Sequence, residues 1–241
     1  MKTETVEYKD GDVTCRGYVA FDETKSGKRP GILVMPEALG LGTHAKNRAE
    51  RLAKLGYVAL AGDPYGNGLE LPTVEEAIKL AGALFADPSA ARKRGRAALD
   101  KLASMPHVDS SRMAEIGFCM GGTFGLELAR GGAPLRGVVT FHSGLQTQRP
   151  AAAGQLKAKI LVCTGADDPF VPFEHVNAFA DEMTKAGADW QVISYGGTRH
   201  SFTNPDAGKY SVPALAYNKL ADERSWKAMV SFFEEIFAEA S

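Results

Sequence analysis

The stretch G-F-C-M-G-G occupies residues 117–122, between an apolar-rich segment at 113–118 and a segment with helical spacing at 123–130. It places Cys119 between glycines in the pattern G-x-C-x-G, and no second G-x-[Ser/Cys]-x-G occurs in the chain. At a sharp strand-to-helix turn the central residue takes a strained backbone conformation, and glycines two positions before and after it leave room for the bend. The N-terminus of the following helix favours a thiolate. The stretch therefore predicts a nucleophile at an elbow rather than a buried cysteine in a glycine-rich turn.

Predicted strands and helices alternate on both sides of this elbow. An antiparallel hairpin turns at residues 9–12, and six buried strands follow at 30–36, 57–63, 113–118, 136–141, 158–165 and 190–195. The predicted helices lie at 44–55, 72–86, 89–104, 120–130, 173–186 and 222–239. Strands joined through helices form right-handed crossovers, which predicts an α/β fold with a mostly parallel central sheet and helices on both faces. Such sheets carry their chemistry at the C-terminal ends of the strands.

The bulk composition limits the classes of protein to consider. The chain has 241 residues, of which 44% are hydrophobic and 24% charged, and its formal net charge is −1. These values suit a single domain spanning residues 1–241, and the dispersed charges favour neither a nucleic-acid nor a membrane partner. The first ten residues include acids and no apolar core, so we expect no signal peptide. No segment approaches the ~18 consecutive apolar residues of a membrane span.

The cysteines indicate a reducing compartment. Cys15, Cys119 and Cys163 lie far apart and form no C-x-x-C pair, so neither a zinc site nor a dithiol redox motif is expected. An odd number of cysteines without a signal peptide predicts reduced thiols and a cytoplasmic location.

A thiol nucleophile needs a base, and the base needs an orienting acid. In this topology the acid and then the histidine follow the nucleophile in chain order, each after a later strand. Asp167 and Asp168 come after one predicted strand end and His200 after the last. Asp168 is preferred, because the Asp-Pro junction fixes the loop just beyond it. Either residue type alone is common in turns, so the prediction rests on their joint placement. His142, at another strand end, is a candidate for the substrate pocket.

Six segments together resemble the dienelactone hydrolase family of the α/β-hydrolase fold. They are P-E-A-L-G (36–40), G-D-P-Y-G (62–66), the elbow, G-A-D-D-P-F-V-P (165–172), R-H-S-F (199–202) and the C-terminal stretch 216–233. The resemblance covers nearly the whole chain, and the cysteine at the elbow is its most specific part. It implies an α/β-hydrolase fold without a large cap domain. It also implies hydrolysis of small lactones or esters, as by a carboxymethylenebutenolidase, with neither a cofactor nor a metal.

The resemblance also assigns roles to residues. It makes Cys119 the nucleophile, His200 the base and Asp168 the acid that orients it. The oxyanion hole is then formed by the backbone N–H groups of Met120 and Ala38, in agreement with the general pattern of one donor after the nucleophile and one from the loop after the first central strand. Glu37 matches a family glutamate that contacts the resting cysteine, and a carboxylate there is expected to keep the thiol protonated until substrate displaces it.

One position departs from the family pattern. Asn204 stands where the prototype enzymes carry an arginine that binds the substrate's carboxylate, and a neutral amide cannot replace a bidentate guanidinium. Arg199 and Phe202, which flank the histidine in R-H-S-F, are further pocket candidates. A carboxylesterase or thioesterase with the same triad is therefore the main alternative. A non-catalytic binding protein and a redox-sensing thiol protein are distant ones. We expect a monomer or a small homo-oligomer.

Overall fold

The structure is a computed structural model that describes residues 1–238. The chain divides into two compact units, Met1–Ile116 and the part from Gly117 onward. The boundary falls inside strand β5, Val108–Phe118, so the two units share one continuous strand.

The first unit begins with the expected antiparallel hairpin. Strands β1, Lys2–Asp10, and β2, Val13–Phe21, pair along their whole length, and Gly11 in the turn has φ +57°. Strand β2 then pairs antiparallel with β4, Val58–Ala61, and β4 pairs parallel with β3, Arg29–Met35. Strands β3 and β4 are almost wholly buried, in agreement with their unbroken apolar sequences.

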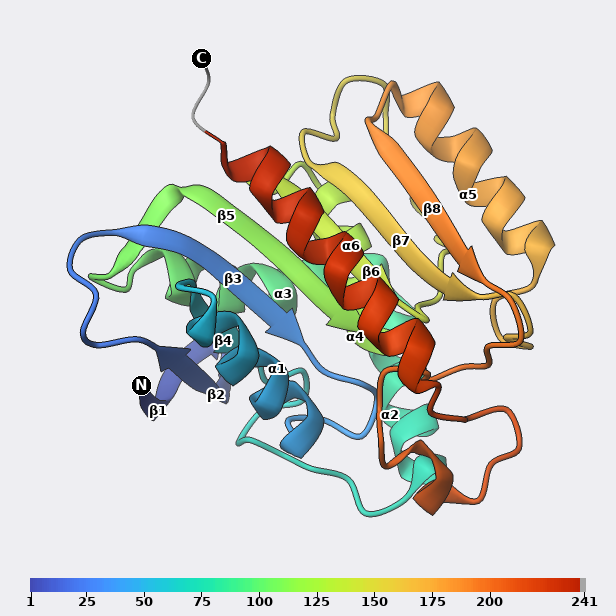
Figure 1. Cartoon of the computed structure of the whole chain (residues 1–241), viewed down its shortest axis with the longest axis horizontal. Coiled ribbons are helices and arrows are strands. Elements are labelled where there is room, and N and C mark those ends of the chain that lie inside the picture. The colour runs from blue at the N-terminus through green and yellow to red at the C-terminus, as the bar shows by residue number, and fades with distance from the viewer. Residues whose placement is uncertain (239–241) are drawn as a thin grey trace. The chain divides into compact units, whose positions relative to one another are not determined.

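Three helices accompany these strands: α1, Thr43–Lys54, α2, Val74–Phe85, and α3, Pro88–Ala103. Helix α3 starts where Asp87 accepts a hydrogen bond from the Ser89 N–H at 2.9 Å, with Pro88 in the first helical position. Helix α1 packs on β2, β3 and β4, and α3 packs on β1, β3 and β4. Figure 1 shows α1 in front of β3 and α3 behind it, so this part of the sheet is covered on both faces.

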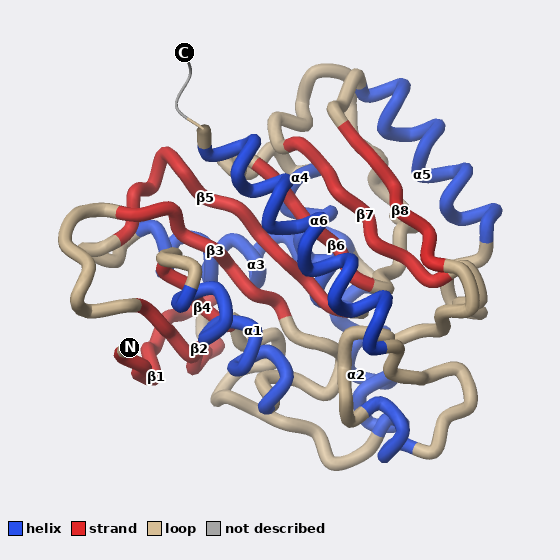
Figure 2. The backbone as a smooth tube through the Cα atoms, in the orientation of Figure 1, coloured by secondary structure: helices blue, strands red, loops and turns tan. Residues whose placement is uncertain are grey.

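The second unit contains three parallel strands: β6, Gly137–Phe141, β7, Lys159–Gly165, and β8, Trp190–Tyr195. Its helices are α4, Met120–Arg130, α5, Phe173–Ala186, and α6, Lys219–Phe237, with a short 3-10 helix, η1, at Ala207–Tyr210. Helix α4 packs on β6, and α6 packs on β6 and β7. Figure 2 shows loops of this unit at both ends of β7 and β8.

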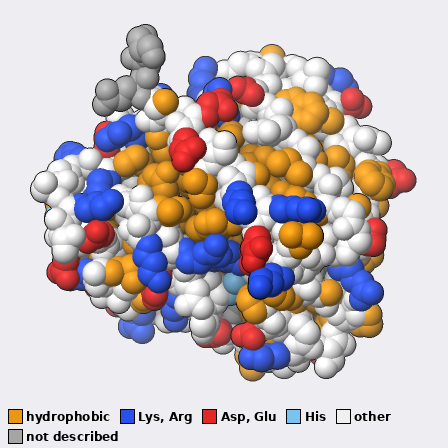
Figure 3. All heavy atoms as spheres, viewed as in Figure 1, with side chains coloured by type: hydrophobic (Ala, Val, Ile, Leu, Met, Phe, Trp, Pro, Cys, Tyr) orange, Lys and Arg blue, Asp and Glu red, His pale blue; other side chains and the backbone are white. Residues whose placement is uncertain are grey.

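The hydrogen-bonded strands follow the order β1-β2-β4-β3-β5-β6-β7-β8. The prediction of a mostly parallel sheet preceded by an antiparallel hairpin is therefore confirmed. No helix within residues 1–238 is both long and apolar enough to cross a membrane. On the face drawn in Figure 3, Lys and Arg side chains are interspersed with Asp and Glu, as the net charge of −1 leads one to expect.

Two element boundaries differ from the prediction for local reasons. Strand β5 begins at Val108, five residues before the predicted start. The added residues are mostly polar, and Asp109 among them accepts hydrogen bonds from the Ser111 N–H and hydroxyl. Because this extension has no apolar pattern, the sequence did not indicate it. Helix α6 begins at Lys219, because the Asn218 side chain caps the Ala221 N–H at 3.1 Å. The 3-10 helix η1 was not predicted.

Candidate active site

Cys119 lies at the turn between β5 and α4, in a backbone conformation that few residues adopt. Its φ is +53° and its ψ is −118°, and its N–H donates to the Phe141 carbonyl on β6 at 2.9 Å. A Cβ atom at Gly117 would collide with the backbone of Gly121 and Gly122, so only glycine fits there. The structure thus gives the physical reason for the G-x-C-x-G spacing.

The sulfur of Cys119 stands at the N-terminus of an eleven-residue helix, α4, of which Met120 is the first residue. The aligned peptide dipoles and the exposed N–H groups of the first turn stabilise negative charge at this point. The side chain is partly accessible, whereas the thiols of Cys15 and Cys163 are buried. Burial raises the pKa of Cys15 to about 11.

His200 and Asp168 form the buried pair that the sequence predicts. The imidazole Nδ1 lies 2.7 Å from Asp168 Oδ2, and both side chains are almost wholly buried. The second carboxylate oxygen, Oδ1, accepts the Phe170 N–H at 2.9 Å, which fixes the orientation of the carboxylate. Asp167 is exposed and contributes its backbone N–H to the Thr198 carbonyl. The structure therefore selects Asp168, and not Asp167, as the partner of the histidine.

The Cys119 side chain is close enough to His200 to act on the pKa of its imidazole. Because Nδ1 faces Asp168, the Nε2 edge of the ring is the one left for another partner. Burial by itself lowers the pKa of His200, but the interactions with Cys119 and with Asp168 outweigh it and raise the pKa to about 10.

The loop that carries His200 is tied to a later segment of the chain. The His200 N–H donates to the Ala214 carbonyl at 3.1 Å, and the Ala216 N–H donates to the His200 carbonyl at 3.0 Å. The Asn218 N–H donates to the Phe202 carbonyl at 3.1 Å. Ser201 beside the histidine has φ +55°. These bonds hold the imidazole in place and anchor residues 214–218.

His142 packs directly against the histidine of this pair. Its ring is fully buried, lies 5.1 Å edge-on from the His200 ring, and its Nε2 is 2.8 Å from Thr203 Oγ1. Phe202, also fully buried, lies 5.2 Å edge-on from His142. Both predicted pocket residues are therefore buried beside the His200–Asp168 pair, where His142 packs on the imidazole and Phe202 packs on His142.

Phe170 is a neighbour of His200 that sequence reasoning missed as a site residue. Its ring lies 5.1 Å edge-on from the imidazole and is 53% exposed, so a bound molecule can touch both. The motif G-A-D-D-P-F-V-P contains this residue, but the contact joins positions 170 and 200, which no local pattern reveals.

Asn204 and Arg199, the other two pocket candidates, have different environments. Asn204 is buried, and its Oδ1 accepts the Asp206 N–H at 2.9 Å. Arg199 is exposed, and its Nη1 donates to the Pro213 carbonyl at 2.9 Å. The guanidinium of Arg199 is thus bonded to the chain itself.

Glu37 and Ala38 lie in the first unit, in the loop that follows β3. The Ala38 carbonyl accepts the Tyr65 hydroxyl at 2.7 Å, which anchors this loop. Glu37 Oε2 lies 3.8 Å from Nδ1 of His44 in the first turn of α1, and His44 Nε2 accepts the Arg48 Nε–H at 3.2 Å. No local pattern in the sequence connects Glu37 with His44. Within residues 1–238 no group of three or more His, Cys, Asp or Glu side chains is placed to hold a metal ion.

A mostly parallel sheet with a cysteine at its strand–helix elbow defines the α/β-hydrolase class. A family model described as the dienelactone hydrolase family matches residues 15–237. The chain belongs to the dienelactone hydrolase family and is a hydrolase that acts on ester or lactone bonds.

Individual relatives agree with this family. A Bradyrhizobium protein named "Probable 2-oxo-3-(5-oxofuran-2-ylidene)propanoate lactonase" is 30% identical over 217 residues, which is 84% of this chain and 86% of that protein. The crystal structure of a dienelactone hydrolase-like promiscuous phosphotriesterase, P91, from metagenomic libraries is 46% identical, with a TM-score of 0.94 over 98% of this chain and 99% of that one. A structure titled m3DLH is also 46% identical, with a TM-score of 0.95 and the same coverage.

Proposed function

We propose that the protein hydrolyses small lactones or esters with the triad Cys119–His200–Asp168, through a thioester acyl-enzyme. The observation that carries this proposal is the buried pair of His200 and Asp168, with Nδ1 2.7 Å from Oδ2, beside a Cys119 side chain that acts on the pKa of the imidazole. The sulfur stands at the N-terminus of α4, so each element that a thiol nucleophile needs is supplied within one unit.

In the first half-reaction the Cys119 thiolate attacks the substrate's carbonyl carbon. The new carbon–sulfur bond converts the carbonyl into a tetrahedral oxyanion, for which we propose the Met120 and Ala38 N–H groups as donors. One such donor contributes about 3–4 kcal/mol in comparable sites. The imidazolium of His200 then protonates the leaving oxygen as the carbon–oxygen bond breaks. The products of this half-reaction are a thioester and the alcohol or ring-opened enol.

In the second half-reaction His200, now neutral, takes a proton from water. The resulting hydroxide attacks the thioester carbon, and the carbon–sulfur bond breaks. The acid leaves, and the thiolate–imidazolium pair is restored. Asp168 holds the imidazole in one orientation through both steps, because its two oxygens are fixed by His200 and by the Phe170 N–H.

The leaving group determines the substrate class. A thiolate leaves more readily than an alkoxide or an amide, so the tetrahedral intermediate collapses forward only when the substrate's own leaving group is good. Enol lactones, aryl esters and thioesters meet this condition, whereas amides and peptides do not. The half-exposed Phe170 ring beside His200 favours substrates with an apolar group at this place.

Further assignments complete the proposal. Glu37 modulates the resting nucleophile, an assignment that rests on its position in the family motif P-E-A-L-G. The protein works in the cytoplasm as a single domain, as a monomer or a small homo-oligomer. Three free thiols support the location, and the passage of β5 through the unit boundary supports the single domain.

A substrate panel tests the proposed class. We expect turnover of p-nitrophenyl acetate, enol lactones and acyl thioesters, and none of the matching amides. A chelator should leave the rates unchanged. The Cys119→Ala variant should lose turnover of the whole panel, whereas Cys15→Ala, which removes a buried thiol, should keep it. Activity that survives in Cys119→Ala would contradict the proposal.

A carboxylesterase or thioesterase is the second candidate, and Asn204 is the observation that favours it. The side chain at this position is a buried neutral amide, not the arginine that clamps a substrate carboxylate. A higher kcat/KM for neutral aryl esters or thioesters than for carboxylate-bearing lactones would select this candidate.

A further inference from the structure

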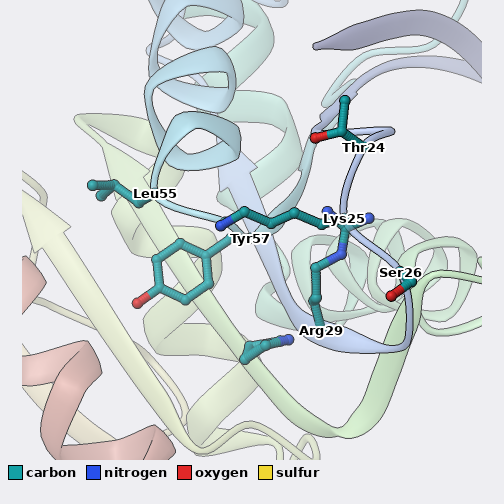
Figure 4. A pocket seen from close by; sticks show the side chains of 8 residues that line it. Thr24, Lys25, Ser26, Arg29, Leu55 and Tyr57 are labelled. Atoms are coloured by element: carbon teal, nitrogen blue, oxygen red, sulfur yellow. The ribbon is translucent and has the colours of Figure 1, made fainter.

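The first unit contains a depression of about 540 Å³ that none of the proposed catalytic residues lines. It lies between the loop 22–28, the start of β3 and the turn that follows α1. Its walls include Thr24, Lys25, Ser26, Arg29, Leu55 and Tyr57, which are labelled in Figure 4. Arg29 is the first residue of β3, whereas the loop with Glu37 and Ala38 follows the other end of the same strand. The depression is therefore at the opposite edge of this part of the sheet from the proposed oxyanion loop.

Arg29 is a buried cation whose hydrogen-bonding capacity is largely unused. The residue is only 8% exposed. Its Nη1 donates to the Asp22 carbonyl at 2.8 Å, but Nε and Nη2 are buried and have no acceptor among residues 1–238. Nε and Nη2 form the edge of the guanidinium that grips two oxygen atoms of a carboxylate or phosphate at once. A buried charged donor without an acceptor lowers the stability of the fold, so we expect a hydrogen-bond acceptor at this edge of the guanidinium.

The neighbouring carboxylate does not provide that partner. Asp22 Oδ1 accepts the Thr24 N–H at 3.0 Å and the Thr24 hydroxyl at 2.7 Å, and it makes no ion pair with Arg29. The Phe21 ring centroid lies 5.9 Å from Arg29 Cζ, a contact that holds the cation without using its N–H groups.

Lys25 adds a second cation to the same depression. Its side chain is exposed and borders the depression, and its charge also acts on the Asp22 carboxylate. Figure 4 shows its stem crossing the depression beside the upper end of the Arg29 side chain, with the ammonium group directed toward the turn after α1. A Cβ atom built on Gly56 in that turn would lie 2.8 Å from Lys25 Nζ. An exposed lysine of this kind changes rotamer at little cost.

We propose that this depression binds a small oxyanion, namely the carboxylate or phosphate group of a metabolite. Two of its oxygens accept hydrogen bonds from Arg29 Nε and Nη2 after the Lys25 stem swings aside. The Lys25 ammonium then neutralises the remaining charge, and the Ser26 hydroxyl supplies a further donor. None of the proposed catalytic residues lines this site, so the test of anion binding does not depend on the proposed hydrolase mechanism.

Nuclear magnetic resonance of the full chain tests the site with inorganic phosphate, acetate and chloride as probes at matched ionic strength. We expect saturable shifts of the Arg29 Nε–H and Gly56 amide signals with phosphate or acetate, and none with chloride. The probe that binds more tightly identifies the preferred anion. The Arg29→Gln variant should lose the saturable shift of the Gly56 amide.

A matched pair of variants at Leu55 keeps the test independent of Arg29's own role in folding. Leu55 is 47% exposed at the rim, so both changes are tolerated. Leu55→Glu places a carboxylate at the rim on the side where the Lys25 ammonium ends (Figure 4) and should weaken phosphate binding by about tenfold or more, whereas Leu55→Gln should bind as the parent does. Equal shifts with chloride, shifts that do not saturate, or equal affinities in the two Leu55 variants would overturn the proposal. In those cases the guanidinium edge is hydrated only.

Discussion

His200 combines deep burial with a proton affinity that burial alone would reduce. Its pKa is raised to about 10, although burial acts to lower it, because the Cys119 sulfur and Asp168 both stabilise the imidazolium. The imidazole is further fixed between the rings of His142 and Phe170, each 5.1 Å away. The raised pKa of His200 therefore depends on Cys119 and Asp168 together.

This dependence gives a prediction at the residue scale. In the free enzyme the His200 imidazole should remain protonated as pH rises past 6.5, the ordinary histidine value, and lose its proton only near pH 10. In the Cys119→Ala variant the interaction with the sulfur is lost while the effect of burial remains, so the His200 pKa should fall well below that of the parent. Imidazole chemical shifts recorded against pH measure both values. An unchanged titration in the variant would contradict the role of Cys119 in raising the His200 pKa.

At the scale of elements, the elbow depends on the absence of side chains. Gly117 at the end of β5 approaches the backbone of Gly121 and Gly122 at the start of α4 so closely that a Cβ atom would strike main-chain atoms. Main-chain atoms in a strand and a helix cannot move aside as a flexible side chain can. The strand, the turn and the helix are thus built as one unit around Cys119.

Replacing Gly117 with alanine should therefore destabilise the protein by more than about 3 kcal/mol, the upper range for overpacking in a rigid core. Urea unfolding at neutral pH measures the change. The control is Gly82→Ala in α2, where a new Cβ atom meets nothing within 4 Å and the glycine has no positive φ. This change should stabilise the helix by about 0.5–1 kcal/mol. Similar effects at the two glycines would contradict the steric account of the elbow.

On the scale of the whole molecule, the core contains an acid, Glu115, whose carboxyl group has no hydrogen-bond partner in the described part of the chain. Glu115 on β5 is 0% exposed, and neither of its carboxylate oxygens has a hydrogen-bond partner among residues 1–238. Burial raises its pKa well above the ordinary value of 4.5, so the folded protein holds it neutral. The unfolded chain releases that proton at lower pH, so folding stability falls as pH rises above 4.5.

The Glu115→Gln variant removes this titration and nearly preserves the shape. Relative to the parent, it should gain stability between pH 4.5 and pH 8, by more than about 1.4 kcal/mol, the free energy of one pKa unit. Asp109→Asn on the same strand provides a control of opposite sign. Hydrogen bonds from Ser111 and Arg112 lower the Asp109 pKa to about 2, so its contribution to stability is present at neutral pH and lost toward acid. Urea unfolding at several pH values in this range measures both differences in stability. If the difference between Glu115→Gln and the parent did not change with pH, a neutral buried Glu115 would be contradicted.

Local patterns in the sequence predicted the hairpin, the alternation of strands and helices, and the elbow, because glycine spacing and apolar runs are local consequences of steric fit and burial. The same patterns also predicted that Asp168 and His200 each follow the end of a strand. They could not reveal that Phe170 lies against His200, that Glu37 lies near His44, or that the acid in M-A-E-I-G-F is left without a partner. Each of those features depends on which distant side chains meet after folding.

The most direct test of the triad is to trap the acyl group. After brief reaction with p-nitrophenyl acetate and an acid quench, peptide mass spectrometry should find acetyl on Cys119 and on neither Cys15 nor Cys163. The acetyl-enzyme should persist longer in His200→Gln than in the parent, because His200 activates the water that removes it. Turnover with no acetyl on Cys119, or acetyl on another residue at the rate of turnover, would contradict the account.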